Sequence, residues 1–376
     1  MASIKKRGNK FCVIYHYNDS EGKRRQKWET YDTKAEAKKR AKEIEYRAEM
    51  GIISVPKCKL LKELIEEYIL LYGKDKWALS TYEGNMGLIR NYIIPIIGET
   101  KLSEINTRFI EKYYQTLLKT PAVINPIFGK RLNETVGTST IRDIHKLLRS
   151  AFDQAVKWEL MEKNPCIHAT VPKHKAKKRE IWTAEQLMYA IEVCDDEFTK
   201  LALNLAFAGS LRIGELLGLT WDCVDISLEA IQEGRAYIYV NKELQRVSKE
   251  AVKELDGKDV LLIFPEESKR CKTVRILKTP KTDSSVRKIF LPKSVAMMLI
   301  DWKNSQKEIK EVLGEEYQDY GLIMATSYGL PVSGSFVRKG LKKLIEEHDL
   351  PPVVFHSIRH PYVKHTTKKY NSEKQK

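Results

Sequence analysis

Residues Ala208–Leu219 read AGSLRIGELLGL, and this stretch decides how the C-terminal half of the chain is interpreted. An apolar run leads into a break at Gly209-Ser210, and a new amphipathic segment then begins with Arg212 in its first turn and Glu215 three residues later. This spacing places both side chains on one helix face, where the carboxylate can hold the guanidinium. An isolated pair of this kind is usually an ordinary surface ion pair, so its setting decides its meaning.

The composition is typical of a multidomain protein with a polyanionic partner. A chain of 376 residues predicts two or three domains. Its 66 Lys and Arg against 50 Asp and Glu leave a formal net charge of +16, which favours nucleic acid as partner, although ribosome-binding and membrane-surface proteins share such an excess. The sequence contains neither an apolar run of membrane-spanning length nor a secretory signal, so we expect a cytoplasmic protein without membrane contact.

The cysteines predict neither a zinc site nor a disulfide framework. All six, at positions 12, 58, 166, 194, 223 and 271, lie far apart, without a C-x-x-C motif or a nearby histidine pair. We interpret them as small buried residues. The sequence also has no obvious carboxylate cluster for magnesium, so any phosphate chemistry must depend on side chains.

Residues 1–55 are predicted to form a small sheet backed by one helix. Residues 11–17 alternate as a strand, residues 23–30 return as a strongly basic strand, and Thr33 with Glu36 predicts a capping box at the start of a helix that ends near Met50. Such a sheet suits insertion into a DNA groove, and the alternative is a generic module with a solvated lysine face. The basic residues of the second strand are Lys23, Arg24, Arg25 and Lys27.

Residues 56–172 are predicted to form an all-α domain of four helices. Apolar residues recur at spacings of three and four, and the helices are expected to begin near residues 60, 80, 103 and 139. Ser80 with Glu83 predicts a capping box at the second start. We interpret the apolar stripes as core and not as a cofactor site.

A basic connector follows at residues 173–179, and it carries Lys175, Lys177 and Lys178. In isolation it is typical of a solvated linker, and between two DNA-facing domains it could equally lie along the backbone of a duplex.

The last part of the chain combines helices with strands. Residues 236–240 are predicted as a strand, and residues 274–277 and 286–291 as a hairpin around Pro280–Ser284. Residues 242–270 show no period that we can interpret. Four basic side chains stand out across this region, and their conjunction is more specific than any one of them: Arg212, Lys281 at the predicted hairpin tip, His356 and Arg359.

With these motifs the sequence resembles the tyrosine recombinase (phage-type integrase) family, and particularly the integrases of conjugative transposons. The motifs are residues 209–215 (GSLRIGE), 279–282 (TPKT) and 356–360 (HSIRH). The resemblance implies a multidomain α+β protein: an arm-type DNA-binding domain with a three-stranded sheet plus helix at 1–55, a four-helix core-type DNA-binding domain at 56–172, and a mainly α catalytic domain with a small antiparallel sheet at 173–376.

The resemblance also implies roles for the four basic residues. Arg212 and Arg359 would clamp the phosphate of a DNA strand, because their planar forks grip two oxygens and stay charged. His356 would hydrogen-bond the same phosphate, and Lys281 would be the general acid, since neighbouring arginines favour release of its proton. Glu215 would orient Arg212. Arg287 and Lys288 would be hairpin or backbone contacts.

The implied reaction breaks and rejoins double-stranded DNA at arm-type and core-type sites through a 3′-phosphotyrosyl intermediate. It needs no metal and no nucleotide cofactor. The family implies a homo-tetramer on DNA, with accessory DNA-bending or excision factors as possible partners.

The sequence departs from the family at its end. The nucleophilic tyrosine of the family lies a few tens of residues beyond the second arginine, whereas here only 17 residues follow Arg359 and Pro361 stands where Ser or Thr is usual. Tyr362 is too close to Arg359, and Tyr370 is a weak candidate in a polar tail, so we assign no nucleophile. We therefore expect impaired strand cleavage through truncation or frameshift. The alternatives are a non-catalytic DNA-binding regulator that occupies recombination sites and a type IB topoisomerase-like enzyme.

Overall fold

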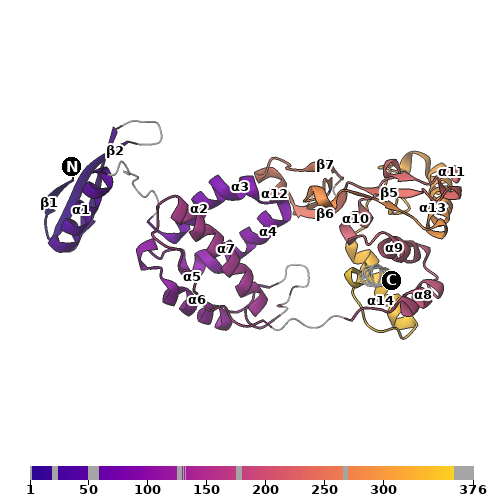
Figure 1. Ribbon diagram of the computed structural model, residues 1–376, viewed down its shortest axis with the longest axis horizontal. Helices are drawn as coiled ribbons and strands as arrows, with labels where there is room; N and C mark the ends of the chain where they lie inside the picture. Colours follow the sequence, from indigo (N-terminus) through magenta and orange to yellow (C-terminus); the bar gives the residue numbers. More distant parts are fainter. Residues whose placement is uncertain are drawn as a thin grey trace, which may run out of the picture. The chain divides into compact units, whose positions relative to one another are not determined.

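The structure is a computed structural model, and it describes residues 2–18, 24–49, 59–124, 129, 131, 133–174, 180–265 and 270–359 (Figure 1). The chain forms two compact units. One comprises Met1–Gly73 with Asn85–His174, and the other comprises Lys74–Gly84 with Lys175–Lys376. The division into three domains made from the sequence stays a prediction.

The first unit begins with an antiparallel sheet packed on one helix, as predicted. The strands lie in the order β1-β2-β3, and α1 covers one face, where Val13 and Tyr15 are buried against Ala37 and Ala41. The predicted capping box at the start of α1 is confirmed, because Thr33 Oγ1 accepts from the Glu36 N–H at 3.2 Å. The elements are β1 (Ser3–Arg7), β2 (Lys10–Asn18), β3 (Arg24–Tyr31) and α1 (Lys34–Glu49).

A buried carboxylate ties the sheet to the helix in this module. Glu29 on β3 is 8% exposed and accepts hydrogen bonds from the hydroxyls of Tyr15 (2.6 Å) and Tyr31 (2.7 Å) and from Arg40 Nε on α1 (2.9 Å). Burial opposes ionisation of Glu29, but these hydrogen bonds outweigh it and lower its pKa to about 2.

Between residues 61 and 157 the regular elements of the described chain are helices, and their apolar stripes are buried as predicted. Two starts differ from the prediction. The second helix begins at Leu79, so Ser80 lies inside its first turn and cannot be its N-cap. The third begins at Thr107, because Asn106 Oδ1 accepts from the Phe109 N–H at 3.0 Å and caps it there. The elements are α2 (Leu61–Tyr68), the π-helix η1 (Ile69–Gly73), α3 (Lys74–Lys76), α4 (Leu79–Leu88), the π-helix η2 (Ile89–Ile93), α5 (Ile94–Ile97), the 3₁₀-helix η3 (Leu102–Glu104), α6 (Thr107–Lys119) and α7 (Thr138–Lys157).

The second unit surrounds one apolar core with helices and two small sheets. Helix α9 is at the centre of the core, where it contacts α8, α10, α13 and α14. The helices from Thr183 onward are α8 (Ala184–Glu192), α9 (Glu197–Ala208), α10 (Ile213–Leu217), α11 (Leu228–Gln232), α12 (Lys249–Glu254), α13 (Lys293–Leu313) and α14 (Gly334–Glu347), with 3₁₀ turns η4 (Trp221–Cys223), η5 (Asp283–Ser285), η6 (Gly314–Glu316) and η7 (Phe355–Arg359).

Two three-stranded antiparallel sheets replace the single small sheet and the hairpin predicted from the sequence. Their orders are β4-β5-β9 and β6-β8-β7. The predicted hairpin of β8 with β9 is wrong, because β8 is the central strand of its sheet and already pairs with β6 and β7 on both edges, whereas β9 pairs with β5. The strands are β4 (Val224–Asp225), β5 (Tyr237–Val240), β6 (Glu243–Ser248), β7 (Val260–Ile263), β8 (Thr273–Lys278) and β9 (Arg287–Phe290).

This topology changes the place of Lys281. Residues 279–286 do not close a hairpin; they carry the chain from one sheet to the other. The segment that the sequence left uninterpreted, residues 242–270, supplies β6, α12 and β7.

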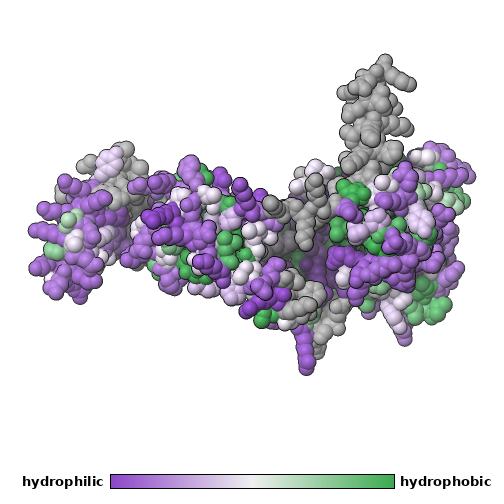
Figure 2. Space-filling view, turned by 90° about the horizontal axis from the view of Figure 1, so that it is seen from below, coloured by the Kyte–Doolittle hydropathy of each residue, from purple (hydrophilic) through white to green (hydrophobic). Residues whose placement is uncertain are grey.

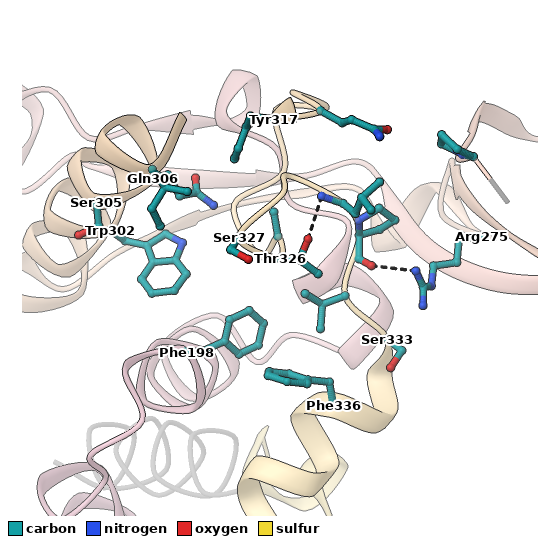
Figure 3. Close-up of a pocket in the computed structure, with 17 residues that line it drawn as sticks. Phe198, Arg275, Trp302, Ser305, Gln306, Tyr317, Thr326, Ser327, Ser333 and Phe336 are labelled. Carbon is teal, nitrogen blue, oxygen red and sulfur yellow. Dashed lines mark hydrogen bonds between the residues drawn. The ribbon is translucent and has the colours of Figure 1, made fainter. Parts of the chain in front are cut away.

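A cavity of about 660 Å³ lies in this unit, and the sequence did not predict it (Figure 3). Phe198, Trp302 and Phe336 face one another at its wall, with ring centroids of Phe198 at 6.0 Å from Trp302 and 5.1 Å from Phe336. The guanidinium of Arg275 at the wall donates to the Pro331 carbonyl at 3.0 Å.

Hydrophilic side chains cover most of the face drawn in Figure 2, and hydrophobic ones form small separate groups on it. Within the described ranges, every helix is too short or too polar to cross a bilayer.

Candidate functional site

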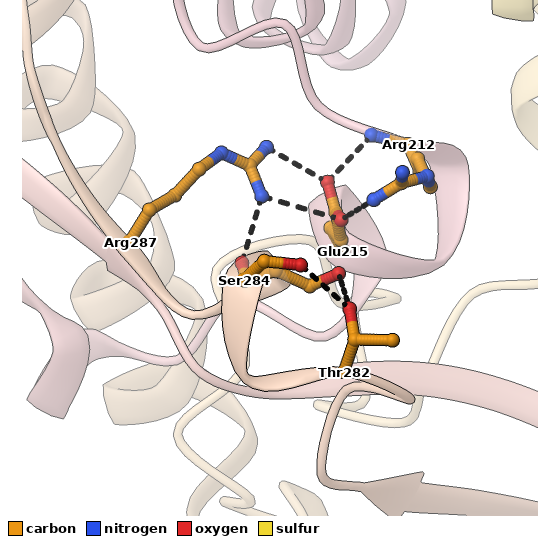
Figure 4. A network of polar contacts seen from close by, with 6 residues as sticks. Arg212, Glu215, Thr282, Ser284 and Arg287 are labelled. Atoms are coloured by element: carbon orange, nitrogen blue, oxygen red, sulfur yellow. Dashed lines mark hydrogen bonds and ion pairs between the residues drawn. The ribbon is translucent and has the colours of Figure 1, made fainter.

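The centre of the candidate site is Glu215, which is 1% exposed at the start of α10 (Figure 4). Arg212 is the N-cap of this helix. Its backbone N–H donates to Glu215 Oε2 at 2.9 Å, and its Nη1 donates to Oε1 at 2.6 Å. Because the carboxylate is buried, the pair is not the ordinary surface ion pair that the spacing alone would suggest. The Arg212 side chain remains 52% exposed, so its guanidinium is both fixed and accessible.

Gly218 and Ser210, at the two ends of the AGSLRIGELLGL stretch, shape the backbone around this arrangement. At Gly218, which ends α10, a Cβ would lie 2.7 Å from Glu243 Cα and 2.7 Å from Leu244 N on β6. Only glycine therefore permits the backbone of α10 to approach β6 so closely. At the other end of the stretch, Ser210 has a φ of 47°, and it turns the chain sharply between α9 and α10.

A second arginine, Arg287 on β9, grips the same carboxylate. Its Nη2 donates to Glu215 Oε2 at 3.0 Å and its Nη1 to Oε1 at 3.3 Å, and Nη1 also donates to the Ser285 carbonyl at 2.9 Å (Figure 4). The sequence alone predicts only a hairpin or backbone contact for Arg287 and does not reveal this role. The alternation along β9 was the available signal, since Arg287 and Ile289 are half-buried while Lys288 and Phe290 are exposed.

The surroundings keep Glu215 ionised. Burial alone would raise the pKa of this carboxyl, but the hydrogen bonds from Arg287 and Arg212 and the positive charge of Arg287 outweigh burial and lower the pKa below its ordinary value. A buried, charged acceptor with four donors therefore fixes two guanidinium groups at once.

The loop with Lys281 is attached to this network. Ser285, whose carbonyl accepts from Arg287, also donates its N–H to the Thr282 carbonyl at 2.9 Å, and the Thr282 hydroxyl lies 3.0 Å from Ser285 Oγ (Figure 4). Lys281 precedes Thr282, is exposed, and lines a second cavity of about 660 Å³ together with Lys242 and Asp259.

Arg359 and His356 lie on the short helix η7 at the end of the described chain. Phe355 and Ile358 are buried there, which leaves His356 exposed and Arg359 half-buried. Burial, followed by the positive charge of Arg212, lowers the pKa of the Arg359 guanidinium, while the charge of Glu215 opposes this shift. The structure therefore places Arg359 within electrostatic reach of both Arg212 and Glu215. The Ser210 hydroxyl donates to the Arg359 carbonyl at 3.5 Å.

The arrangement favours binding of a small anion. Arg212 and Arg287 both bind the Glu215 carboxylate, which fixes their geometry, and the charges of all three groups act on Arg359, so the cluster retains positive charge. Among the residues that the structure describes, no group of three or more His, Cys, Asp or Glu side chains could hold a metal ion.

The predicted basic strand is divided between two faces. In the register of β3 with β2, Arg24 pairs with Asn18 and is exposed, whereas Lys27 pairs with the buried Tyr15 and is half-buried on the face that α1 covers. The side chain of Arg25 lies outside the part of the chain that the structure describes. Lys23, Lys175, Lys177, Lys178, Tyr362 and Tyr370 lie outside the described residues.

Comparison with known proteins finds one matching domain model and several related sequences. Residues 60–118 match the model of the phage integrase N-terminal SAM-like domain. A tyrosine recombinase XerC-like protein of Caldanaerobacter subterraneus is 28% identical over 292 residues, which are 75% of this chain and 64% of that protein. The ICEBs1 integrase of Bacillus subtilis is 27% identical over 239 residues, which are 63% of this chain and 56% of that protein. This chain thus spans less than two thirds of either relative.

A solved structure shares the fold. The Tn1549 transposon integrase in complex with transposon right end DNA has a TM-score of 0.60 and 17% identity, and the match covers 82% of this chain and 87% of that one. The likeness confirms the predicted fold class, a mixed α+β protein with small antiparallel sheets.

Proposed function

Because the chain belongs to the tyrosine recombinase family, we propose that it is the site-specific recombinase of a mobile element, which breaks and rejoins double-stranded DNA through a 3′-phosphotyrosyl intermediate. The observation that carries this proposal is the buried Glu215, whose carboxylate fixes the guanidinium of Arg212 while leaving it exposed, in a cluster with excess positive charge.

The proposed chemistry assigns one task to each group. Arg212 and Arg359 hold the non-bridging oxygens of the attacked phosphate and stabilise the charge of the transition state. A tyrosine oxygen bonds to phosphorus while the bond to the 5′-oxygen breaks, and Lys281 gives that oxygen its proton. His356 hydrogen-bonds the same phosphate. The phosphotyrosyl bond preserves the phosphodiester for rejoining, so the cycle needs no metal or nucleotide cofactor.

DNA recognition is proposed for the other parts of the chain. Residues 1–55 would bind arm-type sites, with Arg24 on the open face of the sheet, and residues 56–172 would bind core-type sites. The connector at residues 173–179 would follow the DNA backbone. We propose a homo-tetramer on DNA, assisted by DNA-bending or excision factors, in the cytoplasm.

The nucleophile is the part of the proposal that most needs an experiment. No nucleophile is assigned, and Tyr370 is a weak candidate. If Tyr370 is not the nucleophile, the alternative function is that this chain binds DNA without breaking it. The chain would then act as a regulator or competitor at recombination sites.

The test uses the purified full-length chain and duplexes that it selects from a random-sequence library, followed by nicked versions of the selected duplex. We expect binding that weakens steeply with salt, and a covalent adduct that survives denaturation would show that this chain also cleaves DNA. Any adduct should disappear in Arg212→Ala, while Lys288→Ala, which removes an exposed charge on β9, should retain it. Its loss in Tyr370→Phe would identify Tyr370 as the nucleophile. Specific binding without any adduct would support the regulator, and an adduct that persists in Tyr370→Phe would exclude that tyrosine as nucleophile.

A further inference from the structure

We infer that Arg287 is a positioning residue that couples the loop carrying Lys281 to the helix start carrying Arg212, with Glu215 as the shared link. This inference rests on the proposed function for its consequence at the phosphate, although the coupling itself can be measured without DNA.

The contacts of Arg287 point in two directions. Toward α10, its fork spans both oxygens of the buried Glu215, at 3.0 and 3.3 Å, and these oxygens in turn hold the backbone N–H and the Nη1 of Arg212. Toward the loop, Nη1 donates to the Ser285 carbonyl at 2.9 Å. One guanidinium therefore connects the loop to helix α10, although Arg287 and Glu215 are 72 residues apart in the sequence.

The loop side of this link ends next to the proposed general acid. The N–H of Ser285 closes the turn on the Thr282 carbonyl at 2.9 Å, and Thr282 directly follows Lys281. Because the loop joins two different sheets, hairpin pairing does not fix its position. The contacts of Arg287 with Ser285 and Glu215 supply a restraint that a hairpin would otherwise provide.

Arginine suits this position better than lysine. A guanidinium presents several donors in one plane and can bind a carboxylate and a carbonyl together, whereas an ammonium is a point charge. The side chain of Arg287 is 28% exposed and points its donors into the network, so we assign it no contact with the phosphate.

Lys288 provides a matched control. It lies on the same strand and carries the same charge, but it is exposed on the opposite face, with its Nζ 3.9 Å from the centroid of the Tyr237 ring. Replacing either residue by glutamine removes one positive charge from β9, and only Arg287→Gln breaks the link.

The first experiment measures amide hydrogen exchange in the full-length chain without DNA. We expect Arg287→Gln to accelerate exchange of the Ser285 amide and of the Leu216 amide, which bonds to the Arg212 carbonyl, by about tenfold or more. Lys288→Gln should leave both amides unchanged, and Arg287→Lys should be intermediate. Equal exchange in Arg287→Gln and Lys288→Gln would overturn the inference. If Arg287→Gln does not fold, the neutral pair Glu215→Gln with Arg287→Gln and the single variant Arg287→Lys replace it.

The second experiment measures the consequence at the phosphate. The selected duplex is prepared with a phosphate or a neutral methylphosphonate at the attacked position, and the ratio of the two affinities reports the clamp. We expect Arg287→Gln to lower the wild-type ratio by about tenfold, which corresponds to one charge-assisted hydrogen bond. Lys288→Gln, which removes an exposed charge on the opposite face of β9, should keep the ratio.

The two experiments separate two kinds of failure. A wild-type chain that does not discriminate between the duplexes contradicts the proposed function, while the exchange result still decides the coupling. A wild-type chain that discriminates, with an unchanged ratio in Arg287→Gln, overturns the positioning role.

Discussion

Replacing Glu215 by glutamine should destabilise the unit that contains it, because the carboxylate is the only acceptor shared by its two arginines in the Figure 4 network. Glutamine retains one oxygen acceptor, but its amide group must then face guanidinium N–H donors. Arg287 then keeps one of its two hydrogen bonds to this side chain, and one of the two Arg212 donors also loses its acceptor.

The cost can be worked out from these contacts. A hydrogen bond to a charged group contributes about 1.5–3 kcal/mol to stability, and a partly buried donor that loses its acceptor also pays for desolvation. The contact of Arg212 Nη1 is discounted because this side chain is 52% exposed and water can replace it. We expect a loss of roughly 3 kcal/mol in the free energy of unfolding, or about 6–12 °C in the melting temperature of a unit of this size.

The pH dependence gives an independent check on the mechanism. The pKa of Glu215 in the folded protein is below the ordinary value of 4.5, so its contribution to stability is fully present above that value and is lost as the pH falls through the folded pKa. The stability difference between wild type and Glu215→Gln should therefore be constant at neutral pH and shrink below about pH 4.5.

The assay is scanning calorimetry of the full-length chain at pH 7 and at acidic pH, with Glu229→Gln as the control. Glu229 accepts from Arg235 at 2.8 Å, but both side chains are exposed, and a pair of that kind contributes less than about 1 kcal/mol. Equal losses for the two variants at pH 7, or a Glu215→Gln difference that does not change with acid, would refute the reasoning.

Three further predictions concern other parts of the chain. Gly218→Ala should cost about 1–3 kcal/mol in unfolding free energy, because the new Cβ would lie 2.7 Å from backbone atoms of Glu243; an unchanged melting temperature would contradict this. Glu29→Gln should lower the melting temperature of the N-terminal module at pH 7. The difference from wild type should vanish toward pH 2, because hydrogen bonds, including that from Arg40, outweigh burial and lower the Glu29 pKa to about 2. Circular dichroism melts at the two pH values measure both effects. Lys281→Ala should slow cleavage of ordinary DNA but should hardly affect a strand with a 5′-bridging sulfur, whose leaving group needs no proton, and equal slowing on both strands would exclude Lys281 as the general acid.

Local features of the fold could be predicted from the sequence because their causes lie within a few residues. The capping box of Thr33 and Glu36 and the buried helical stripes both follow from spacing alone. The capping box predicted at Ser80 is wrong, because the helix begins at Leu79 and Ser80 lies inside its first turn.

Strand pairing could not be predicted in the same way. The two runs around Lys281 have the length, composition and intervening turn of a hairpin, yet β8 and β9 belong to different sheets. The partners of β8 include β7, from a segment without an interpretable period, so the competing pairing was invisible in the sequence. Pairing depends on which edges remain free in three dimensions.

The stretch Ala208–Leu219 illustrates which features follow from the sequence and which depend on the tertiary structure. Its sequence by itself determined that Arg212 and Glu215 share a helix face, because their spacing fixes that geometry in any helix. Only the tertiary structure decided that Glu215 is buried and that Arg287 completes its coordination from another strand. A contact between residues 72 positions apart depends on how sheets and helices pack, and no local spacing encodes that packing.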